Sequence, residues 1–572
     1  MNEEVDMEKI WMKSWPDFLP KEPYYPQGEK PIFEYLRNNA KVFPDRVAIN
    51  FYGREITYAE LDKASEQFAN FLVGSGFKKG DRIALFLQTC PQYHIAYYGI
   101  IKMGGVMVPC SQAFKEWELT YQLKDSGARA IVTLDLFYPI AASSCKECGI
   151  ETIILTSLHD YLPEKPTINL LSMMDTPKRT YPGTIELLDI LARFPADPVQ
   201  ADIQLSDIVQ LQYTGGTTGL PKGAILTHRG KLFKAAWAMN VISGSLKFLG
   251  HQGDAIICLA PFPIFNIAGH LRIADILIAL GATHILLSMY DPIAAMQAVD
   301  HYKVHYFHTT VPMNVGISNH PERKNYDLSS LLLSFTSSFG IQLNADIVQQ
   351  WKDTTGKCVL AETAYGLSET HTSDTFMPVN RPKYDRGCTG LPIPGSDFKI
   401  VYFEDRAREV PLGEIGEIAM KNPAVFNGYW NKPEETKNAL IDGWLFTGDM
   451  GKFDEEGYLY FLGRKKDMIK TSGFSVFPEE VELFLNRHEA VEKVAVIGVP
   501  DDKKGEIIKA FIVPKAQFKK SVQADEIIAW TRQNISPYKV PKSIEFVDDL
   551  PMSGAGKVLR RVLLDGELKK KG

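Results

Sequence analysis

Helical patterns alternate with short apolar runs over residues 57–132, and this alternation constrains the fold more than any other feature of the sequence. Residues 58–77 form an amphipathic pattern that ends at glycine, and GDRIALFL follows as a buried strand. Residues 118–134 repeat the order of helix, glycine and strand. Because parallel strands need a crossover between them, the alternation predicts an α/β fold with parallel sheets flanked by helices.

The second half of the sequence changes character twice. Residues 284–312 continue the alternation, but short strands and turns follow residue 387, which predicts a small β-barrel-like module. Beyond residue 464, the patterns fit a separate α+β domain of about a hundred residues. Since 572 residues exceed what one core holds, we predict a large N-terminal domain over residues 1–463 and a small mobile C-terminal domain over 464–572.

Charge and hydropathy narrow the class of protein. The formal net charge of -6 gives no general attraction for nucleic acid, so any phosphate site must be local. No basic region followed by an apolar run opens the sequence, so no secretory signal is expected. Residues 267–287 are interrupted by His270, Arg272 and Asp275 and are expected to form a core helix that leads to a strand. We predict a cytoplasmic protein whose lysine-rich tail gives at most peripheral membrane contact.

The cysteines do not suggest a disulfide framework. There are seven, so at least one is unpaired, and a reducing compartment fits best. Cys145 and Cys148 form a C-x-x-C pair, but no second pair completes a zinc site. We expect these two thiols to serve ordinary packing.

The stretch TGGTTGLPKG, which begins at Thr214, follows the apolar run of residues 208–213. Glycines let backbone N–H groups approach a phosphate closely, while hydroxyls and an ammonium add further donors. The stretch fits neither the Walker A pattern nor G-x-G-x-x-G. On these grounds alone, a phosphate loop and a flexible surface loop both remain open.

Five stretches in order along the chain resemble motifs of the adenylate-forming superfamily. These are YTGGTTGLPKGAILTH from residue 213, YGLSET from 365, GWLFTGD from 443, GRKKDMIKTSG from 463 and PMSGAGKVLRR from 551. The resemblance spans nearly the whole chain. Within the superfamily, WMKSWPDFLPKE, residues 114–139 and LQYTGGTTG are most similar to bacterial long-chain fatty acid–CoA ligases.

The resemblance implies a site for ATP, which serves to activate a carboxylate as its adenylate. By this likeness Tyr365 stacks on adenine, Ser368 contacts the α-phosphate, and Glu369 binds Mg²⁺, which prefers hard oxygen ligands. Asp449 accepts hydrogen bonds from the ribose hydroxyls, and Arg464 assists there. Gly366 is also assigned to the ATP/AMP site, and the outgoing phosphates are contacted by Thr214, Gly215, Gly216, Thr217, Thr218, Gly219 and Lys222.

The resemblance also assigns roles near the C-terminus. Lys557 bridges the substrate carboxylate and the α-phosphate during adenylation, a task that suits an ammonium on a flexible stem. Lys466 occupies the hinge about which the C-terminal domain turns for the second step. Gly473 lies beside the tunnel for the pantetheine arm of coenzyme A.

Two segments assigned to the acyl pocket depart from the family pattern. Asn266 stands where a histidine is usual, and an amide cannot titrate. Phe339 is bulky where the family places a small residue, between Ser338 and Gly340, so we expect a reshaped pocket. The other candidates, for which plain core packing is an equal alternative, are Trp237, Ile267, Thr310, Val311 and Met313.

These observations predict an AMP-forming fatty acid–CoA ligase that uses ATP, Mg²⁺ and coenzyme A. Alternatives are a ligase for a cyclic or aromatic acid, transfer to a carrier protein, and an inactive adenylate-binding protein. The five residues that carry the chemistry in these motifs are all retained, which argues against an inactive protein. They are Lys222, Glu369, Asp449, Arg464 and Lys557. The predicted partners are small molecules and not nucleic acid, and a homodimer is left open.

Overall fold

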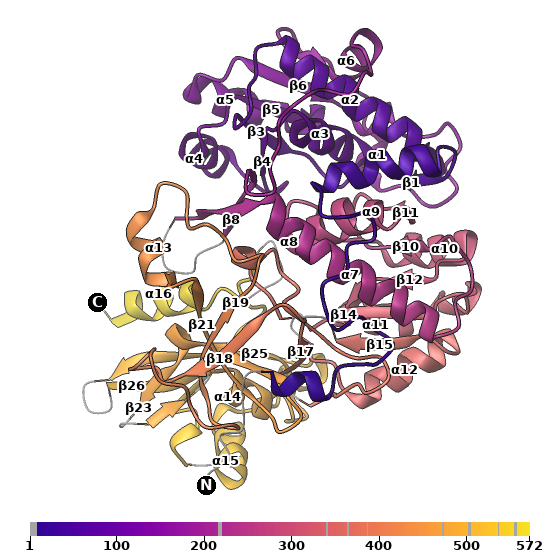
Figure 1. Cartoon of the computed structure of the whole chain (residues 1–572). Helices are drawn as coiled ribbons and strands as arrows, with labels where there is room; N and C mark the ends of the chain where they lie inside the picture. The colour runs from indigo at the N-terminus through magenta and orange to yellow at the C-terminus, as the bar shows by residue number, and fades with distance from the viewer. Residues whose placement is uncertain are drawn as a thin grey trace, which may run out of the picture.

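A computed structural model describes residues 9–214, 220–338, 341–362, 365–385, 387–471, 474–476, 478–501, 505–535, 537–553 and 558–571. Four β-sheets organise this part of the chain, and helices cover them (Figure 1). The first two sheets are mainly parallel, and the third is antiparallel. The fourth belongs to the C-terminal segment, and the mixed α/β architecture predicted from the sequence is confirmed.

The first sheet follows the order β7-β6-β5-β3-β4-β8-β9 and is parallel except for its last pair. Its strands are β3 (Arg82–Phe86), β4 (Val106–Pro109), β5 (Ala130–Leu134), β6 (Thr152–Thr156), β7 (Ile185–Glu186), β8 (Ile208–Thr214) and β9 (Lys222–Thr227). The associated helices are α2 (Tyr58–Gly74), α3 (Pro91–Lys102), α4 (Glu116–Ser126), α5 (Tyr138–Cys148) and α6 (Leu187–Arg193). The predicted helices and strands of residues 57–134 are therefore confirmed.

Local sequence explains where these helices begin and end. Helix α2 begins after Thr57, whose side chain accepts from the Glu60 N–H while the Glu60 carboxylate accepts from the Thr57 N–H. Helix α4 ends at Gly127, whose φ of 63° lies in the left-handed region that suits glycine. Cys145 is buried and Cys148 half-buried on α5, as the packing expectation requires.

The second sheet follows the order β13-β14-β12-β10-β11-β1-β2, with β15 beside β14. Its strands are β1 (Val47–Phe51), β2 (Arg54–Thr57), β10 (Ile257–Leu259), β11 (Thr283–Leu286), β12 (Tyr306–Phe307), β13 (Thr309–Thr310), β14 (Leu333–Ser337) and β15 (Val359–Glu362). The helices around it are α1 (Ile32–Val42), α7 (His228–Phe248), α8 (Ile267–His270), α9 (Leu277–Ala279), α10 (Pro292–Tyr302), α11 (Val311–Ser318) and α12 (Ala345–Thr355).

A π-helical segment, η5 (Leu271–Ile276), joins α8 to α9 and makes one buried helix of the three. His270 and Asp275 are fully buried, and Arg272 is nearly so. The helix leads into β11, so the prediction of a core helix followed by a strand is confirmed. Over the described residues, no helix has both the length and the apolar character needed to cross a membrane.

The third sheet curls into a half-barrel with strand order β16-β17-β22-β21-β19-β18, and β20 pairs with β21. Its strands are β16 (Thr375–Phe376), β17 (Cys388–Pro392), β18 (Asp397–Val401), β19 (Gly416–Lys421), β20 (Leu440–Ile441), β21 (Trp444–Phe453) and β22 (Leu459–Arg464), accompanied by α13 (Pro433–Ala439). This is the predicted barrel-like module.

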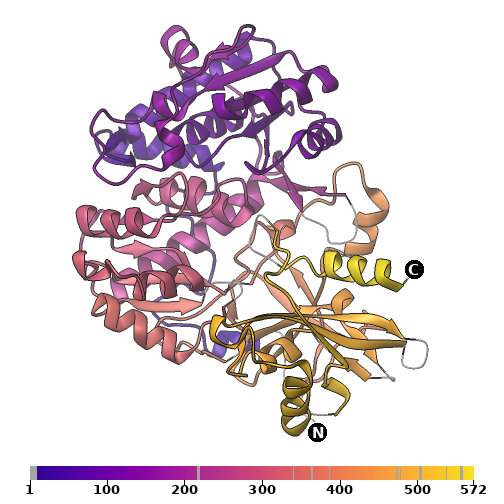
Figure 2. The same cartoon turned by 180° about the vertical axis from the view of Figure 1, so that it is seen from behind.

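The C-terminal segment builds a sheet of order β24-β23-β26-β25, with β27 beside β26. Its strands are β23 (Ile469–Thr471), β24 (Phe474–Val476), β25 (Val491–Asp501), β26 (Gly505–Pro514) and β27 (Ser543–Phe546), and its helices are α14 (Pro478–Leu485), α15 (Ala524–Asn534) and α16 (Arg560–Lys571). The sheet lies with α16 on one side and α14 and α15 on the other (Figure 2).

Alternation along β25 supplies both apolar faces of this sheet. Val494 and Val496 pack with residues of α14 and α15, while Ala495 and Ile497 pack on the side of Leu563 from α16. Strand β22 ends in the third sheet at Arg464 and β23 begins the fourth at Ile469. The domain boundary after residue 463 stays a prediction.

Candidate functional site

The glycine-rich loop connects β8 to β9, and these two strands form an antiparallel pair. Thr214 pairs with Lys222 at the loop end of this hairpin, so both ends of the loop are held by strand register. The predicted buried strand before the loop is confirmed as β8. The Lys222 ammonium lies 5.3 Å from the ring centroid of Tyr429, which places its charge over an aromatic face.

Tyr429 links Lys222 to the predicted metal ligand. Its hydroxyl donates to Oε1 of Glu369 at 2.7 Å, and the Phe426 N–H donates to the Glu369 carbonyl at 2.8 Å. Burial, together with the Glu369 carboxylate, raises the pKa of Tyr429, so its hydroxyl stays a donor. Sequence reasoning missed Tyr429, which stands in FNGYW far from either partner in the chain.

Asp449 lies on β21 with 1% of its surface exposed and is held on two sides. The Tyr365 hydroxyl donates to its Oδ2 at 2.6 Å, and Nε of Arg464 lies 2.8 Å from its Oδ1. Arg464 is the direct cross-strand partner of Asp449 in the β21–β22 pair. Three residues predicted at the nucleoside therefore meet at one carboxylate.

The backbone around Tyr365 is tightly packed. The Tyr365 ring stacks on Phe461 with centroids 5.8 Å apart. A Cβ on Gly366 would lie 2.3 Å from the Ser373 backbone nitrogen, so no side chain fits there without moving the backbone. Ser368 and Glu369 follow in the short 3₁₀ turn Ser368–Thr370. The motif is thus a compact loop that presents Tyr365 and Glu369 from fixed positions.

Three consecutive residues after this motif adopt the left-handed conformation that side chains disfavour. The φ angles are 55° at His371, 61° at Thr372 and 56° at Ser373. Such conformations cost on the order of 1 kcal/mol or more each and persist where the surroundings fix them. His371 is of a residue type enriched in this conformation, but Thr372 and Ser373 are not, so the sequence gives no local signal for three such residues in a row.

A buried ion pair stabilises the left-handed turn at residues 371–373. Lys234 of α7 and Asp374 are both fully buried and bonded to each other, and the Lys234 ammonium also donates to the Ser373 carbonyl at 3.2 Å. Asp374 further accepts from the Thr370 hydroxyl and, at 2.9 Å, from the Asn422 amide. Desolvation lowers the pKa of Lys234 and raises that of Asp374, and each partner opposes the shift of the other. The network therefore positions the loop that carries Tyr365 and Glu369.

The predicted hinge lies beside this site. Lys466 belongs to the 3₁₀ turn Lys465–Asp467, and burial, with Arg464 and Lys222 nearby, lowers its pKa. Arg560 at the start of α16 reaches the same turn, with Nη1 3.5 Å from Asp467 and 2.9 Å from Glu479. Cationic groups of the nucleotide site and the hinge thus lie close together.

The candidates for the acyl pocket occupy mixed environments. Trp237 is buried with its ring edge-to-face on Trp15 at 5.6 Å, and Ile267 and Val311 are also buried. Asn266 caps α8 by accepting from the Ala268 N–H at 3.0 Å, and Thr310 caps α11 by accepting from the Met313 N–H at 3.4 Å. The Asn266 amide thus serves a helix end, a role that the cap preference of asparagine could have predicted.

Ser338 makes a different set of bonds at the end of β14. Its hydroxyl donates to Oε2 of Glu362 at 2.7 Å, its N–H donates to Oε1 at 2.9 Å, and its Oγ accepts from the Leu343 N–H. Burial raises the pKa of Glu362 to about 7, opposed by the two Ser338 donors. Predicted site residues that lie outside the described residues are Gly215, Gly216, Thr217, Thr218, Gly219, Phe339, Gly340, Gly473 and Lys557.

Glu369 suits a magnesium site in which the substrate's phosphates supply part of the coordination. The described residues contain no cluster of three or more His, Cys, Asp or Glu side chains able to hold a metal by themselves. Mg²⁺ is often bound by one or two carboxylates together with substrate phosphates. The Glu369 carboxylate, near the Lys222 end of the phosphate loop, suits that arrangement.

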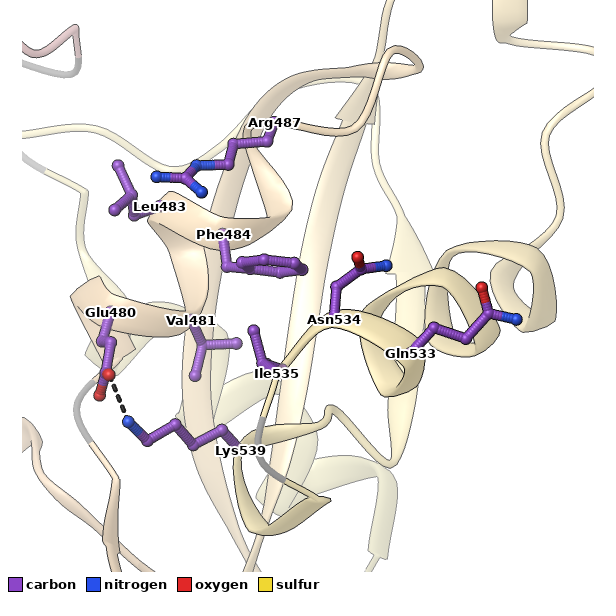
Figure 3. Close-up of a pocket in the computed structure, with 9 residues that line it drawn as sticks. All are labelled: Glu480, Val481, Leu483, Phe484, Arg487, Gln533, Asn534, Ile535 and Lys539. Atoms are coloured by element: carbon purple, nitrogen blue, oxygen red, sulfur yellow. Dashed lines mark hydrogen bonds and ion pairs between the residues drawn. The ribbon is translucent and has the colours of Figure 1, made fainter.

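A cavity of about 540 Å³ lies away from this site, in the C-terminal segment between α14 and the end of α15. Phe484 and Ile535 point into it, and Glu480 pairs with Lys539 at its edge (Figure 3). It is lined by Glu480, Val481, Leu483, Phe484, Arg487, Gln533, Asn534, Ile535 and Lys539. None of the predicted site residues that the structure describes lines it.

Comparison with known proteins agrees with the geometry. Residues 36–430 match the family described as AMP-binding enzyme, and residues 480–557 match the AMP-binding enzyme C-terminal domain. The chain is 38% identical to a long-chain-fatty-acid–CoA ligase of Bacillus subtilis (strain 168), over 98% of this chain and 99% of that one. It is 31% identical to a feruloyl-CoA synthase of Amycolatopsis sp, over 91% and 96% of the two chains.

Solved structures share the fold. The anthranilate CoA ligase AuaEII in complex with anthranoyl-AMP superposes with a TM-score of 0.78 at 26% identity, covering 94% of this chain and 97% of that one. The anthranoyl-AMP of that complex is an adenylate of the acid on which that enzyme acts. The similarity therefore extends through both the N-terminal and the C-terminal parts of the chain.

Proposed function

The chain belongs to the family of AMP-binding enzymes, and we propose that it is an AMP-forming acyl-CoA synthetase, an acid–thiol ligase. It converts a carboxylic acid, ATP and coenzyme A into an acyl-CoA, AMP and pyrophosphate. The single observation that carries the proposal is the meeting of Tyr365, Arg464 and the buried carboxylate of Asp449 beside the Glu369–Tyr429–Lys222 chain. This arrangement has acceptors for a ribose and cationic and hydroxyl donors for phosphates.

In the first half-reaction, an oxygen of the acid's carboxylate attacks the α-phosphorus of ATP and the bond to the bridging oxygen of pyrophosphate breaks. Asp449 accepts from the ribose hydroxyls and fixes the nucleoside, while Tyr365 offers its ring to the adenine. Lys222 neutralises charge on the leaving phosphates, and Thr214 and the glycines between the two residues donate hydrogen bonds to them. Ser368 contacts the α-phosphate, and Lys557 bridges it to the carboxylate.

Mg²⁺ would be held by Glu369 and would supply a charge that stabilises the triphosphate. The Tyr429 hydroxyl orients Glu369 by donating to one of its oxygens, and no residue of the described ranges donates a side-chain hydrogen bond to the other, which can bind a ligand. Tyr429 is thus a positioning residue in this proposal, acting through the carboxylate it holds.

In the second half-reaction, the sulfur of coenzyme A attacks the carbonyl carbon of the acyl-adenylate, and AMP leaves. We assign residues 1–463 to the domain that holds the adenylate and residues 464–572 to a domain that turns at Lys466. Gly473 then lines the path of the pantetheine arm. The location of such an enzyme is the cytoplasm, where ATP and free coenzyme A are available.

The class of acid is determined by experiment, because the relatives include both a fatty acid–CoA ligase and a feruloyl-CoA synthase. The test measures pyrophosphate and AMP release with MgATP over acids from acetate to palmitate together with benzoate and ferulate, with and without coenzyme A. We expect release with one class of acid and a higher rate with coenzyme A.

A lysine variant separates the half-reactions. Lys557→Ala is expected to lose pyrophosphate release with acid and ATP while retaining thioester formation from supplied acyl-adenylate. The matched control is Lys569→Ala, because Lys569 is an exposed lysine on α16. If no acid supports release, or if Lys557→Ala adenylates as well as the unmodified protein, the proposal fails.

A further inference from the structure

Arg272 is a buried cation without an anionic partner among the described residues. Its side chain is 8% exposed, and no carboxylate of the described ranges forms an ion pair with it. The other buried cations of this region are neutralised: Lys231 by Asp275 at 2.8 Å and Lys234 by Asp374. Since an unpaired buried charge is costly, Arg272 stands out as a group that lacks its counter-ion.

Three hydrogen bonds hold the Arg272 guanidinium in place and identify which of its nitrogen atoms have partners. Nε donates to Nδ1 of the buried His308 at 3.1 Å. Nη1 donates to the Ala268 carbonyl at 3.0 Å, and Nη2 lies 3.5 Å from the Ser373 hydroxyl. Ala268 and Ser373 are only half-buried, so the tip of the guanidinium faces away from the core. A guanidinium has five N–H donors, and two of these have no partner among the residues that the structure describes.

His308, which accepts the hydrogen bond from Nε of Arg272, is uncharged. Its Nδ1 accepts from the Tyr306 hydroxyl at 2.6 Å as well as from Arg272, and burial lowers its pKa far below the ordinary value. Burial lowers the pKa of Arg272 to about 10, opposed by Tyr306, which leaves the guanidinium charged at neutral pH. Neither neighbour therefore supplies the missing negative charge.

The position of Arg272 places it among segments predicted to hold the acid. It follows Asn266 and Ile267 on the same buried helix, and its Nη1 binds the carbonyl of Ala268 within the first turn. Its partner His308 lies two residues before Thr310, and the Phe262 ring packs edge-to-face on His308 at 5.2 Å. The helix is π-helical at Arg272, and such insertions are frequent at functional sites.

Resting on the proposed function, we infer that Arg272 determines acid specificity by binding an anionic oxygen group carried on the acyl part of the substrate. The preferred acid would then have a second carboxylate in addition to the one that is activated. A carboxylate matches the planar fork of a guanidinium and supplies the counter-ion that Arg272 lacks. An alkyl end placed there would leave the charge buried and unpaired.

The test compares acids of equal length that differ only at the far end. The pairs are hexanoate and adipate, octanoate and suberate, decanoate and sebacate, and benzoate and terephthalate, and the readout is kcat/KM for pyrophosphate release. At the best length the unmodified enzyme is expected to favour the dicarboxylic acid at least about tenfold. Arg272→Met is expected to reverse that preference, and Arg272→Lys to restore part of it.

Two measurements keep structural damage apart from specificity. Melting temperatures and the KM for ATP report whether Arg272→Met remains folded and binds nucleotide. Arg46→Met is the matched control, because Arg46 is a half-buried arginine that stacks on Phe43 and donates to the Gly281 carbonyl away from the site. It is expected to leave the acid preference unchanged.

The outcomes separate this inference from the proposed function. If no acid of any kind supports pyrophosphate release, the proposed function fails. If plain acids are activated but dicarboxylic acids are never preferred, or if Arg272→Met lowers the rate equally across every pair, the specificity role is wrong and the ligase remains.

Discussion

Asp449→Asn tests the ribose site by replacing one carboxylate oxygen with an amide NH₂ group. The two oxygens of Asp449 face the Tyr365 hydroxyl at 2.6 Å and Nε of Arg464 at 2.8 Å, and only 1% of the residue is exposed. A carboxylate can accept from both ribose hydroxyls, whereas an amide offers one acceptor and turns a donor toward the second. The substitution therefore removes one charge-assisted bond to the nucleotide.

Such a bond is worth about 1.5–3 kcal/mol, which corresponds to a loss of about ten- to 150-fold in kcat/KM for ATP. The assay is ATP–pyrophosphate exchange at a saturating acid concentration, run with ATP and with its 2′-deoxy and 3′-deoxy analogues. The unmodified enzyme should discriminate against both analogues. Asp449→Asn should lose discrimination against the hydroxyl that it no longer binds.

Asp454→Asn provides the matched control. Asp454 follows β21 directly and pairs with Lys383 at 2.7 Å, so the same chemical change is made in the same sheet away from Tyr365. It should leave the nucleotide discrimination intact. If Asp449→Asn discriminates between ATP and the deoxy analogues as sharply as the unmodified enzyme, then Asp449 does not bind the ribose and the reasoning is refuted.

Three further predictions concern the supports of the site. Gly366→Ala should lower the adenylation rate at least about tenfold and lower the melting temperature, since its Cβ would lie 2.3 Å from a backbone nitrogen. Lys234→Met should cost about 3–5 kcal/mol in urea unfolding by stranding the buried Asp374 charge, and Lys234→Met with Asp374→Leu should recover much of that loss. Burial, opposed by Arg560 and assisted by Glu482 and Asp467, raises the pKa of Glu479 from 4.5 to about 7. The folded state therefore holds this proton more tightly, so the melting temperature should fall as pH rises from 4.5 to 7, and Glu479→Gln should flatten that slope. An unchanged slope, a fully active Gly366→Ala or a neutral Lys234→Met would contradict the respective argument.

Most of the fold could be predicted because its signals are local. The helix–glycine–strand order of residues 118–134 is visible in one stretch of sequence, and α4, Gly127 and β5 follow it. The hairpin formed by β8 and β9 could not be predicted in the same way. A short apolar run after a glycine-rich loop gives no indication of which strand it pairs with or in which direction.

The site was predictable where motifs carry it and not where contacts are distant. Tyr365 and Asp449 lie 84 positions apart and were both named from the sequence, because each stands in its own motif. Tyr429 was missed, since a single tyrosine in a glycine-containing turn has no pattern that indicates Glu369 as its partner. The left-handed turn at residues 371–373 was also missed, because Lys234 and Asp374 stabilise it through tertiary contacts rather than through local sequence.

The two-sided covering of the C-terminal sheet has a mechanical consequence. Its strands bury one face against α14 and α15 and the other against α16, so this segment carries its whole apolar interior with it. If this segment turns at Lys466 as proposed, the packing between the sheet and its helices need not change, so the apolar side chains between them stay buried.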